Sequence, residues 1–154
     1  MHISKQSAGV LLYRRYHDII QVFLVHPGGP FWKNKDAGAW SIPKGEFMAG
    51  EDPLGAAKRE FEEETGQKIS GEAIALNPIK QKSGKTVFAW AIEGNVDAEN
   101  IKSNLFEMEW PPRSGKQASF PEVDKAGWFD LPTAAEKLIP AQVDFIRQLE
   151  EILD

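Results

Sequence analysis

Three glutamates carry most of the chemistry that this sequence offers. Glu60, Glu63 and Glu64 are spaced i, i+3 and i+4, which places side chains on one face of a helix. Like charges this close together destabilise a helix unless a positive charge compensates them. Carboxylate oxygens are the ligands that hard divalent cations prefer, and such cations activate phosphate-linked substrates. The spacing therefore indicates either a metal-binding helix or a solvated acidic surface on which Arg59 pairs with Glu63.

The surrounding residues predict a helix over residues 53–65. Asp52 suits the N-cap, and Pro53 suits the first helical position, where its missing N–H costs nothing. Gly66 suits the C-terminal end. An apolar face follows at helical spacing, formed by Leu54, Ala57 and Phe61. At about 100° per residue the three glutamates point away from that face, so we expect one side of the helix to be buried and the other to carry acid into a cleft.

A longer pattern surrounds these glutamates. Its fixed positions are Gly45, Glu51, Arg59-Glu60, Phe61, Glu63-Glu64 and Gly66. Their order and spacing resemble the signature of the Nudix hydrolase family, of which MutT-like proteins are members. The signature covers 23 of the 154 residues, from Gly45 to Gln67. Gln67 is the one departure, because an apolar residue is usual there, and we expect Ile69 to supply the anchoring side chain instead.

The resemblance implies a metal site and a reaction. The implied metal ligands are the backbone carbonyl of Gly45 and the carboxylates of Glu60, Glu63 and Glu64. Arg59 is expected to orient a ligand glutamate through a charge-assisted hydrogen bond, and Glu51 to tune charge or structure near the helix start. The implied reaction is the hydrolysis of a nucleoside diphosphate linked to another group, with Mg²⁺ or Mn²⁺ as cofactor.

The general base is left open by the sequence. Glu64 is the base candidate inside the signature, and Glu63 and Arg59 are also expected to take part in catalysis. Many Nudix proteins supply a further acid from outside it, and in the MutT type this acid lies six residues before a tryptophan. Glu122 lies six residues before Trp128, so we expect Glu122 to be an external ligand or base. Other acids that suit this role are Glu107 and Glu109, and an exposed loop acid is the simpler reading of Glu122.

Basic residues near the signature suggest where a substrate binds. The stretch Trp40 to Gly45 (WSIPKG) resembles the entry to the signature in dinucleoside tetraphosphate hydrolases, and Lys44 is then expected to contact the polyphosphate. Lys33 and Lys35 lie in the preceding loop and are expected to meet phosphates, or simply to be solvated.

A base-stacking residue is harder to identify. Similar proteins often carry a tyrosine after the signature, whereas the only tyrosines here are Tyr13 and Tyr16. Four other aromatic residues suit stacking, although each suits an ordinary core position as well: Phe31, Trp32, Phe88 and Trp90.

Three functions follow, in order of preference. The first is a pyrophosphohydrolase acting on dinucleoside polyphosphates or nucleoside triphosphates. The second is a pyrophosphatase for nucleotide sugars, ADP-ribose or diphosphoinositol compounds. The third is a non-catalytic Nudix module that binds a nucleotide. The intact set of Glu60, Glu63 and Glu64 favours an enzyme, because a pure binder need not retain metal ligands.

Composition fits one small domain spanning residues 1–154. The formal charge of −5 argues against general nucleic-acid binding, although a bound metal can still attract an anionic nucleotide. The chain has no cysteine, which excludes disulfides and thiolate chemistry. Neither a signal-peptide core nor a membrane-spanning run is visible, so we expect a cytoplasmic protein with no membrane partner. The sequence predicts no oligomeric state.

Alternating patterns predict an α/β fold, and the resemblance implies an α/β/α sandwich with a mixed β-sheet. Strands are expected over residues 7–13, 19–25, 40–42, 68–80, 86–92 and 126–129, and helices over 53–65, 133–138 and 141–153. Residues 27–38 are expected to form a loop, and residues 103–119 give no single assignment. Ser83 to Thr86 resembles the end of a P-loop, but Ile79 stands where its first glycine is required, so a hairpin turn is expected. His26 is expected to be structural or near the substrate loop.

Overall fold

A seven-stranded mixed sheet forms the centre of the molecule, for which the computed structural model describes residues 5–153. Its strands are β1 (Gln6–Tyr16), β2 (Ile19–Pro27), β3 (Lys44–Glu46), β4 (Ala73–Ala75), β5 (Ile79–Lys80), β6 (Thr86–Glu93) and β9 (Val123–Asp130). The main order is β4-β6-β1-β2-β9, with β3 paired to β1 and β5 paired to β6. Strands β1 and β6 are parallel and the other pairs are antiparallel, which confirms the predicted mixed sheet.

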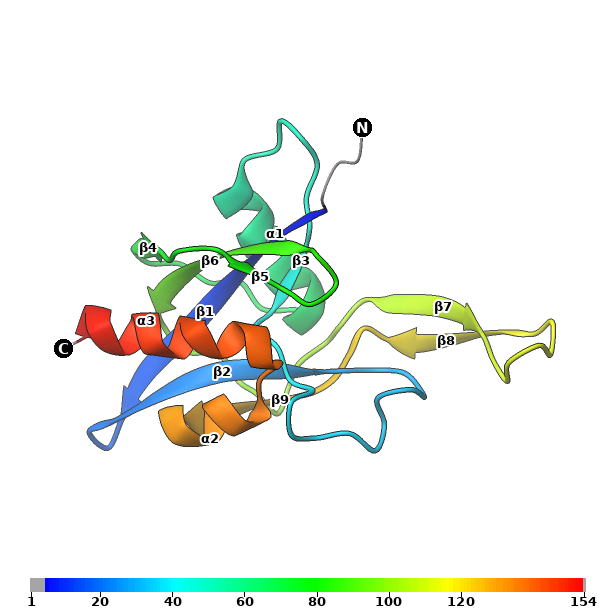
Figure 1. Ribbon diagram of the computed structural model, residues 1–154. Coiled ribbons are helices and arrows are strands. Elements are labelled where there is room, and N and C mark those ends of the chain that lie inside the picture. The colour runs from blue at the N-terminus through cyan, green and yellow to red at the C-terminus, as the bar shows by residue number, and fades with distance from the viewer. Residues whose placement is uncertain (1–4, 154) are drawn as a thin grey trace.

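Helices cover both faces of this sheet (Figure 1). Helix α1 (Pro53–Thr65) packs on one face, and α2 (Leu131–Lys137), the 3₁₀ turn η1 (Pro140–Gln142) and α3 (Val143–Leu153) pack on the other. Successive side chains of a strand point to opposite faces. Val10 and Leu12 accordingly join the core around α1, whereas Leu11 and Tyr13 join the core around α3. The α/β/α sandwich is therefore confirmed.

Helix α1 has the predicted bounds and caps. The Asp52 carboxylate accepts a hydrogen bond from the Gly55 N–H at 2.9 Å. Gly66 adopts φ 75°, and its N–H donates to the Glu62 carbonyl at 2.7 Å. A left-handed residue at this position favours glycine, so the helix ends where the sequence indicated.

Other predicted elements differ from the structure. Residues 68–80 form two short strands, β4 and β5, instead of one, because Gly71 adopts φ 130° and Pro78 has no N–H to donate to a ladder. Trp40 and Ser41 form isolated bridges instead of a strand. Helix α2 begins two residues earlier than predicted, since Asp130 caps it by accepting from the Thr133 N–H at 2.9 Å.

Residues 103–119, which had no single assignment, contribute most of a separate hairpin. Strands β7 (Leu105–Glu109) and β8 (Gln117–Pro121) pair only with each other and project from the body of the molecule (Figure 1). Residues 81–85 form the hairpin turn between β5 and β6, as predicted for the Ser83–Thr86 segment. The Gly84 N–H donates to the Gln81 carbonyl at 2.8 Å, and Thr86 begins β6. No helix within residues 5–153 combines the length and apolar character needed to cross a membrane.

The segment leading to Gly45 lies directly against β1. A Cβ atom at Gly9 would lie 2.6 Å from the Pro43 carbonyl oxygen, so a side chain there would displace this segment. The Val10 N–H donates to the same carbonyl at 3.1 Å. The buried Gln142 side chain accepts from the Ile42 N–H at 3.0 Å. These contacts fix Lys44 and Gly45 beside α1.

Candidate active site

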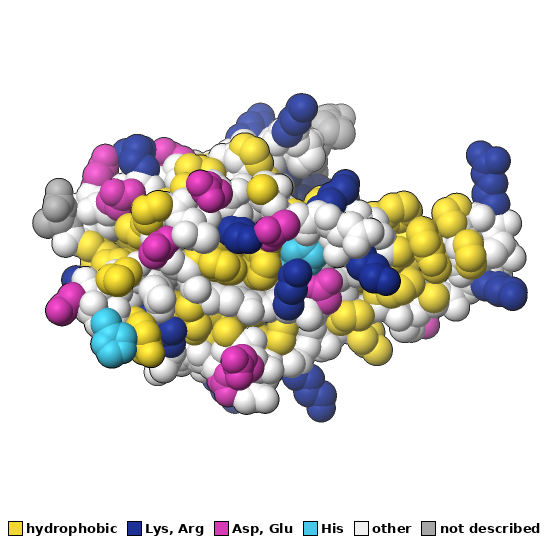
Figure 2. Space-filling view, turned by 90° about the horizontal axis from the view of Figure 1, so that it is seen from below, with side chains coloured by type: hydrophobic (Ala, Val, Ile, Leu, Met, Phe, Trp, Pro, Cys, Tyr) yellow, Lys and Arg dark blue, Asp and Glu magenta, His cyan; other side chains and the backbone are white. Residues whose placement is uncertain are grey.

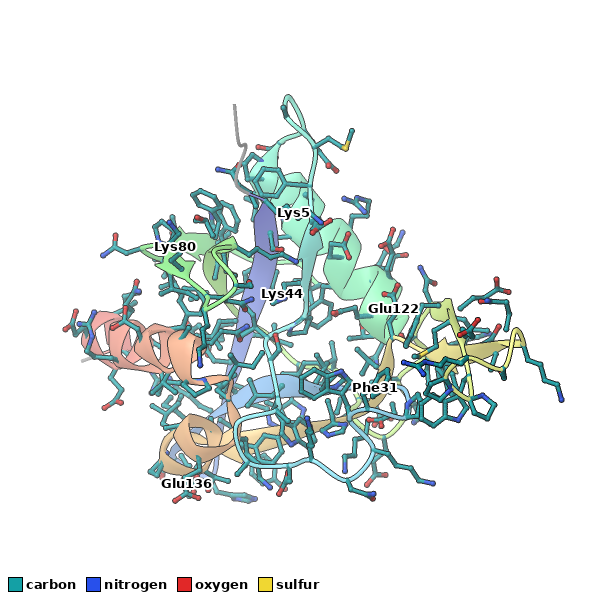
Figure 3. All side chains as sticks on the ribbon, turned by 45° about the vertical axis from the view of Figure 1, so that its right-hand side comes forward. Lys5, Phe31, Lys44, Lys80, Glu122 and Glu136 are labelled. Atoms are coloured by element: carbon teal, nitrogen blue, oxygen red, sulfur yellow. The ribbon has the colours of Figure 1, made fainter. Side chains whose placement is uncertain are left out.

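Four carboxylates gather beside the C-terminal half of α1. Glu60, Glu63 and Glu64 come from the helix, and Glu122 comes from the junction of β8 and β9. Backbone hydrogen bonds join these segments: the Asn104 N–H donates to the Glu63 carbonyl at 2.9 Å, and the Glu122 N–H donates to the Asn104 carbonyl at 2.9 Å. Figure 3 shows Glu122 near the end of α1, with Lys44 beside the same helix.

Glu64 differs from its predicted orientation. The helical pattern placed it on the open side of α1, but its side chain is buried, with the residue only 8% exposed. The reason is that α1 also packs against β3, so Glu64 lies between the helix and the backbone of Lys44. Its Oε1 accepts from the Lys44 N–H at 3.3 Å, while Oε2 is buried without a hydrogen-bond partner. Burial raises the pKa of Glu64 to about 8.

Glu60 lies against the backbone of Gly45. A Cβ atom at residue 45 would overlap the Glu60 carboxylate, so glycine is required for this close approach. Burial, followed by the nearby charge of Glu63, raises the pKa of Glu60. Glu122 is exposed, as the simpler reading of this residue expected. Partial desolvation still raises the pKa of Glu122, and the charge of Glu63 raises it further. The structure thus brings the predicted ligands to one place.

Arg59 connects the acidic face to the loop before the helix. Its Nη1 donates to Glu60 Oε1 at 2.9 Å and to Glu63 Oε1 at 3.3 Å. Its Nη2 donates to Glu51 Oε2 at 3.0 Å, and Glu51 in turn accepts from the Met48 N–H at 3.2 Å. Arg59 therefore contacts the glutamates it was expected to orient, and Glu51 anchors the arginine.

The acidic side chains are not arranged as the ligands of a metal ion. Within residues 5–153, no three His, Asp or Glu side chains are arranged to hold a metal ion. Arg59 engages Glu60 and Glu63, and Glu64 turns toward Lys44. The chemistry of the group nevertheless fits a divalent cation. A buried carboxylate oxygen without a partner and acids with raised pKa values are both conditions that a bound cation relieves.

The expected phosphate-binding lysines occupy two different environments. Burial lowers the pKa of Lys44, and the charge of Glu64 offsets only part of that effect. Lys44 is therefore adjacent to the acidic group. Lys33 and Lys35 are exposed on the loop between β2 and β3, where the Lys35 Nζ lies 5.0 Å from the centre of the Trp32 ring.

The alternative external acids lie on the hairpin. Glu107 and Glu109 are exposed residues of β7, and Glu109 accepts from the Arg113 N–H at 2.8 Å. Glu122, by contrast, contributes to the raised pKa values of Glu60 and Glu64. All three acids are exposed, but backbone hydrogen bonds through Asn104 link Glu122 to Glu63, so its position beside α1 favours Glu122 over the two hairpin acids.

The four aromatic residues considered for base stacking fall into a packed pair and an exposed pair. Phe88 stacks edge-to-face with Phe47, and Trp90 packs against the core around α1. Phe31 and Trp32, on the loop between β2 and β3, are 59% and 38% exposed. Only the second pair therefore presents a free aromatic surface of useful size.

His26 connects two segments of the site from a buried position. From the sequence, only its place after a predicted strand indicated a structural role. It is fully buried in β2. Its Nδ1 lies 2.8 Å from Asp124 Oδ1, and its Nε2 donates to the Lys35 carbonyl at 2.6 Å. His26 thus joins the loop that carries Lys33 to the strand that follows Glu122.

The departure at Gln67 affects packing, as expected. The Gln67 side chain accepts from the Asp97 N–H at 2.9 Å and donates to the Asp97 carbonyl at 2.8 Å. Ile69 packs against the apolar core around α1. The chain therefore replaces one apolar contact by two backbone hydrogen bonds and a neighbouring isoleucine.

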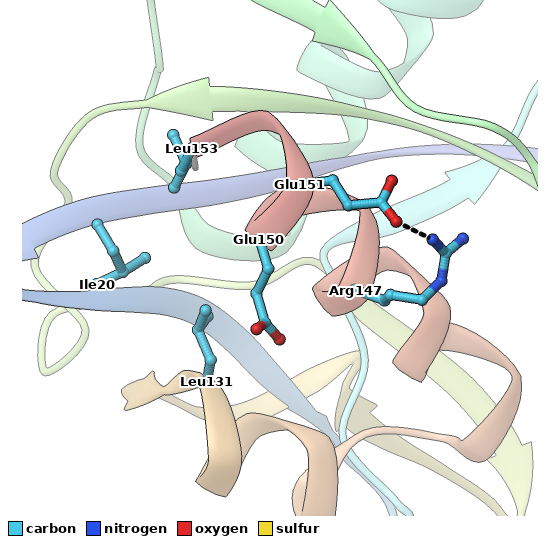
Figure 4. A pocket seen from close by; sticks show the side chains of 6 residues that line it. All are labelled: Ile20, Leu131, Arg147, Glu150, Glu151 and Leu153. Atoms are coloured by element: carbon cyan, nitrogen blue, oxygen red, sulfur yellow. Dashed lines mark hydrogen bonds and ion pairs between the residues drawn. The ribbon is translucent and has the colours of Figure 1, made fainter.

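A separate hollow of about 440 Å³ opens beside α2 and α3 (Figure 4). It lies on the face of the sheet opposite α1, and it contains the Arg147–Glu151 ion pair, with a separation of 2.6 Å. The pair is exposed, and so is Glu150, the third charged residue that lines the hollow. The charged groups of this hollow are therefore solvated, unlike Glu64.

Comparisons with known proteins agree with this geometry. A family model described as the NUDIX domain matches residues 4–149. An Ap4A hydrolase from C. elegans, solved as a binary complex, is 21% identical, with 97% of each chain covered and a TM-score of 0.67. The NUDIX domain of Shewanella oneidensis NrtR, complexed with ADP ribose, is 14% identical, with 100% of this chain and 91% of that chain covered and a TM-score of 0.68.

A curated relative is the octanoyltransferase of Myxococcus xanthus, which is 32% identical over 101 residues, or 66% of this chain. The match spans only 25% of that protein's length. The two solved structures share the fold at low identity, whereas the family model covers nearly the whole chain and includes the acidic helix. The chain therefore belongs to the Nudix hydrolase family.

Proposed function

We propose that this Nudix hydrolase is a divalent-cation-dependent pyrophosphohydrolase that cleaves a nucleoside diphosphate linked to another group. The preferred substrates are dinucleoside polyphosphates or nucleoside triphosphates, and residues 1–154 act as one Nudix domain. The observation that carries the proposal is the buried, unpartnered Oε2 of Glu64 within a group of four carboxylates beside Gly45. A purely structural acidic surface would leave Glu64 solvated, whereas Glu64 is buried.

The proposed cofactor is Mg²⁺, with Mn²⁺ as a substitute. The residues that would hold it are Gly45, through its carbonyl, and Glu60, Glu63, Glu64 and Glu122. When bound, such a cation neutralises phosphate charge and lowers the pKa of water. Arg59 supports the site by holding Glu60 and Glu63 through one hydrogen bond to each.

Glu64 is the preferred general base. A general base must offer a free lone pair close to the attacking water, and Glu64 lies buried beside Lys44 and Gly45 at the centre of the acidic group. Its Oε2, which has no other partner, is the atom that would accept the proton of the attacking water. Glu122 is the alternative. Lys44 would bind the polyphosphate, helped by Lys33 and Lys35 on the adjoining loop.

The relatives support two substrate classes. The Ap4A hydrolase supports a dinucleoside polyphosphate, and the NrtR domain bound to ADP ribose supports an ADP-ribose-type compound. The WSIPKG segment and the position of Lys44 next to the acidic group favour the first class. The octanoyltransferase supports no substrate class for this chain, because the match spans only 25% of that relative.

A substrate panel tests the proposal. Product release would be measured with Mg²⁺, with Mn²⁺ and with EDTA, using diadenosine tetraphosphate, ATP, ADP-ribose, a nucleotide sugar and a diphosphoinositol phosphate. We expect cation-dependent turnover that is fastest with diadenosine tetraphosphate or ATP. Preference for ADP-ribose or a nucleotide sugar would overturn the substrate class only, whereas tight nucleotide binding without turnover would favour a non-catalytic module.

A further inference from the structure

Two buried glutamines connect the C-terminal part of the chain to segments between strands. Figure 2 shows charged side chains spread over the face of the molecule seen there, whereas Gln142 is fully buried and Gln148 is only 6% exposed. A buried amide is costly unless its oxygen and its nitrogen are hydrogen-bonded. Each of these glutamines makes three hydrogen bonds, but the two bind different segments.

The oxygen of Gln142 pairs with a backbone donor of the segment that leads into β3. Ile42 is fully buried, and the residues before it, Trp40 and Ser41, form isolated bridges instead of a ladder. The Ile42 N–H donates to Gln142 Oε1 at 3.0 Å. A buried N–H without an acceptor is unfavourable, so Ile42 depends on Gln142 for its place.

This anchored donor lies close along the chain to the candidate metal ligands. Two residues after Ile42, the Lys44 N–H donates to Glu64 Oε1 at 3.3 Å. One residue further, Gly45 lies so close to the acidic group that a Cβ atom would overlap a carboxylate. Consecutive Cα atoms are about 3.8 Å apart, so a shift of Ile42 is transmitted to Gly45. Gln142 therefore supports the placement of the Gly45 carbonyl without touching the acidic group.

The nitrogen of the same amide holds a second segment. Gln142 Nε2 donates to Ser41 Oγ at 3.0 Å and to Gln81 Oε1 at 3.1 Å. Gln81 begins the β5–β6 turn, where its N–H donates to the Lys85 carbonyl at 2.8 Å. The Lys85 amine in turn lies 3.1 Å from the carboxylate of Glu46 in β3. One amide thus joins the segment that enters β3 to a turn that contacts β3 again.

The Lys44 side chain lies near the same turn. Burial lowers the pKa of Lys44, Glu64 offsets part of that effect, and the charge of Lys85 lowers the pKa further. The two amines are therefore neighbours. A lysine has a long, flexible stem, so it meets a phosphate reproducibly only where the surrounding segments are fixed. Gln142 supplies such a connection between the segment of Lys44 and the turn of Lys85.

We propose that Gln142 is a positioning residue of the active site. By holding Ile42, it places the Gly45 carbonyl for a divalent cation. By holding Gln81, it keeps the β5–β6 turn beside Lys44, where phosphate would bind. The inference rests on the proposed function, because it assumes a cation at Gly45.

Gln148 provides a matched control for this role. Its Oε1 accepts from the Asn77 N–H at 2.7 Å, and its Nε2 donates to the Asn77 carbonyl and to Asp144 Oδ2, both at 3.0 Å. Gln148 therefore anchors the segment between β4 and β5, which carries no candidate ligand. The same substitution at the two glutamines removes the same number of hydrogen bonds, but only Gln142 is connected to Gly45.

Ligand binding and hydrogen exchange test the inference without turnover. Calorimetry would measure the affinity for Mn²⁺ and, in saturating Mg²⁺, the affinity for inorganic tripolyphosphate. Gln142→Met retains the length of the side chain, and it should weaken Mn²⁺ binding about tenfold and weaken tripolyphosphate binding as well. Gln148→Met should lower Tm but bind both ligands as the wild type does. Only Gln142→Met should show faster hydrogen exchange at the amides of Ile42 and Lys44.

A second variant separates the two contacts of the amide. Gln81→Ala removes one acceptor at a half-buried residue and leaves the bond between Ile42 and Gln142 in place. It should weaken tripolyphosphate binding about threefold and leave Mn²⁺ affinity unchanged. If Gln142→Met does not fold, Gln81→Ala decides the matter, since unchanged tripolyphosphate binding in this variant would overturn the inference.

Two further outcomes would contradict the positioning role alone. These are a wild-type Mn²⁺ affinity in Gln142→Met, and equal weakening in Gln142→Met and Gln148→Met at a similar loss of Tm. The second result would show that any buried glutamine of this kind affects the site through general stability. A wild type that binds no Mn²⁺ would overturn the proposed function together with this inference, so the two failures can be told apart.

Discussion

The acidic face of α1 and the arm formed by the β7–β8 hairpin and its neighbouring loop are built in opposite ways. Helix α1 is capped at both ends and packed on the sheet, and its acids are buried or engaged by Arg59. The arm projects from the body and presents exposed aromatic and basic residues. Catalytic groups need fixed geometry, whereas surfaces that select substrates tolerate variation on loops. The difference suggests that α1 determines the reaction and the arm determines the substrate.

The largest expected effect comes from the acidic face. Glu63→Gln or Glu64→Gln should lower kcat by at least about a hundredfold, because each removes charge that stabilises the transition state. Circular dichroism should show a folded protein in both cases. Glu62→Gln is the control, since Glu62 is exposed on the same helix. Near-normal turnover in both variants would contradict the assignment of α1 as the catalytic element.

A substitution at Lys44, beside the acidic face of α1, is expected to affect substrates with long and short phosphate chains differently. Lys44→Ala should lower kcat/KM for diadenosine tetraphosphate roughly five- to 150-fold, because the substrate loses a phosphate contact. This corresponds to a loss of about 1–3 kcal/mol of binding free energy. The loss for ADP-ribose should be smaller, because its shorter phosphate chain carries less charge past the carboxylates. Lys80→Ala, an exposed change in β5, serves as the control. Equal losses on both substrates would make Lys44 a structural or general electrostatic residue.

Buried acid on α1 should also make the stability of the metal-free protein pH-dependent. The pKa of Glu64 is raised from 4.5 to about 8, so the folded state holds a proton that the unfolded state has already lost. This contribution is complete below pH 4.5 and disappears as pH rises through about 8. In EDTA, the Tm of wild type should therefore fall more steeply from pH 5 to 8 than that of Glu64→Gln. Parallel curves would show that Glu64 is not buried as described.

Added Mg²⁺ should counteract this loss, because it binds the deprotonated carboxylates. The rise in Tm on adding Mg²⁺ should be larger at pH 8 than at pH 6. A Glu62→Gln protein should behave like the wild type in both experiments.

The smallest expected effect concerns the attachment of the arm. His26→Gln removes one of the two contacts that join Asp124 to the Lys35 carbonyl. Hydrogen exchange should show lower protection of the amides of residues 32–39, and KM should rise about three- to tenfold with less change in kcat. His17→Gln, in the exposed turn between β1 and β2, is the control. Unchanged exchange in the loop would remove His26 from its positioning role.

The sequence predicted the first region much better than the second. The fixed spacing from Gly45 to Gly66, the Asp52 cap and the alternation of β1 depend on local residues, so they could be recognised without a structure. The burial of Glu64 could not, because it arises from the packing of α1 on β3. The hairpin was missed because the prolines and glycine of its tip obscured the alternation of Phe106, Met108 and Trp110.

Contacts between segments far apart in the sequence could not be predicted either. His26 and Asp124 are 98 residues apart, and no local pattern relates them. Phe31 and Trp110 likewise come from distant segments that only the tertiary fold brings together. The spacing of Glu122 before Trp128, by contrast, is a local pattern, and backbone hydrogen bonds through Asn104 place Glu122 beside α1; its role as an external ligand or base stays a prediction.

Anomalous diffraction from a crystal soaked with Mn²⁺ tests the central claim most directly, since it locates the cation without relying on activity. We predict a peak at the carboxylates of Glu60, Glu63 and Glu64 beside Gly45, with Glu122 in direct or one-water contact, and the loss of this peak in Glu64→Gln. A peak at Glu107 or Glu109 with Glu122 turned to solvent would show that the external acid is wrong. No peak at α1 in a crystal that binds Mn²⁺ elsewhere would contradict the metal site itself.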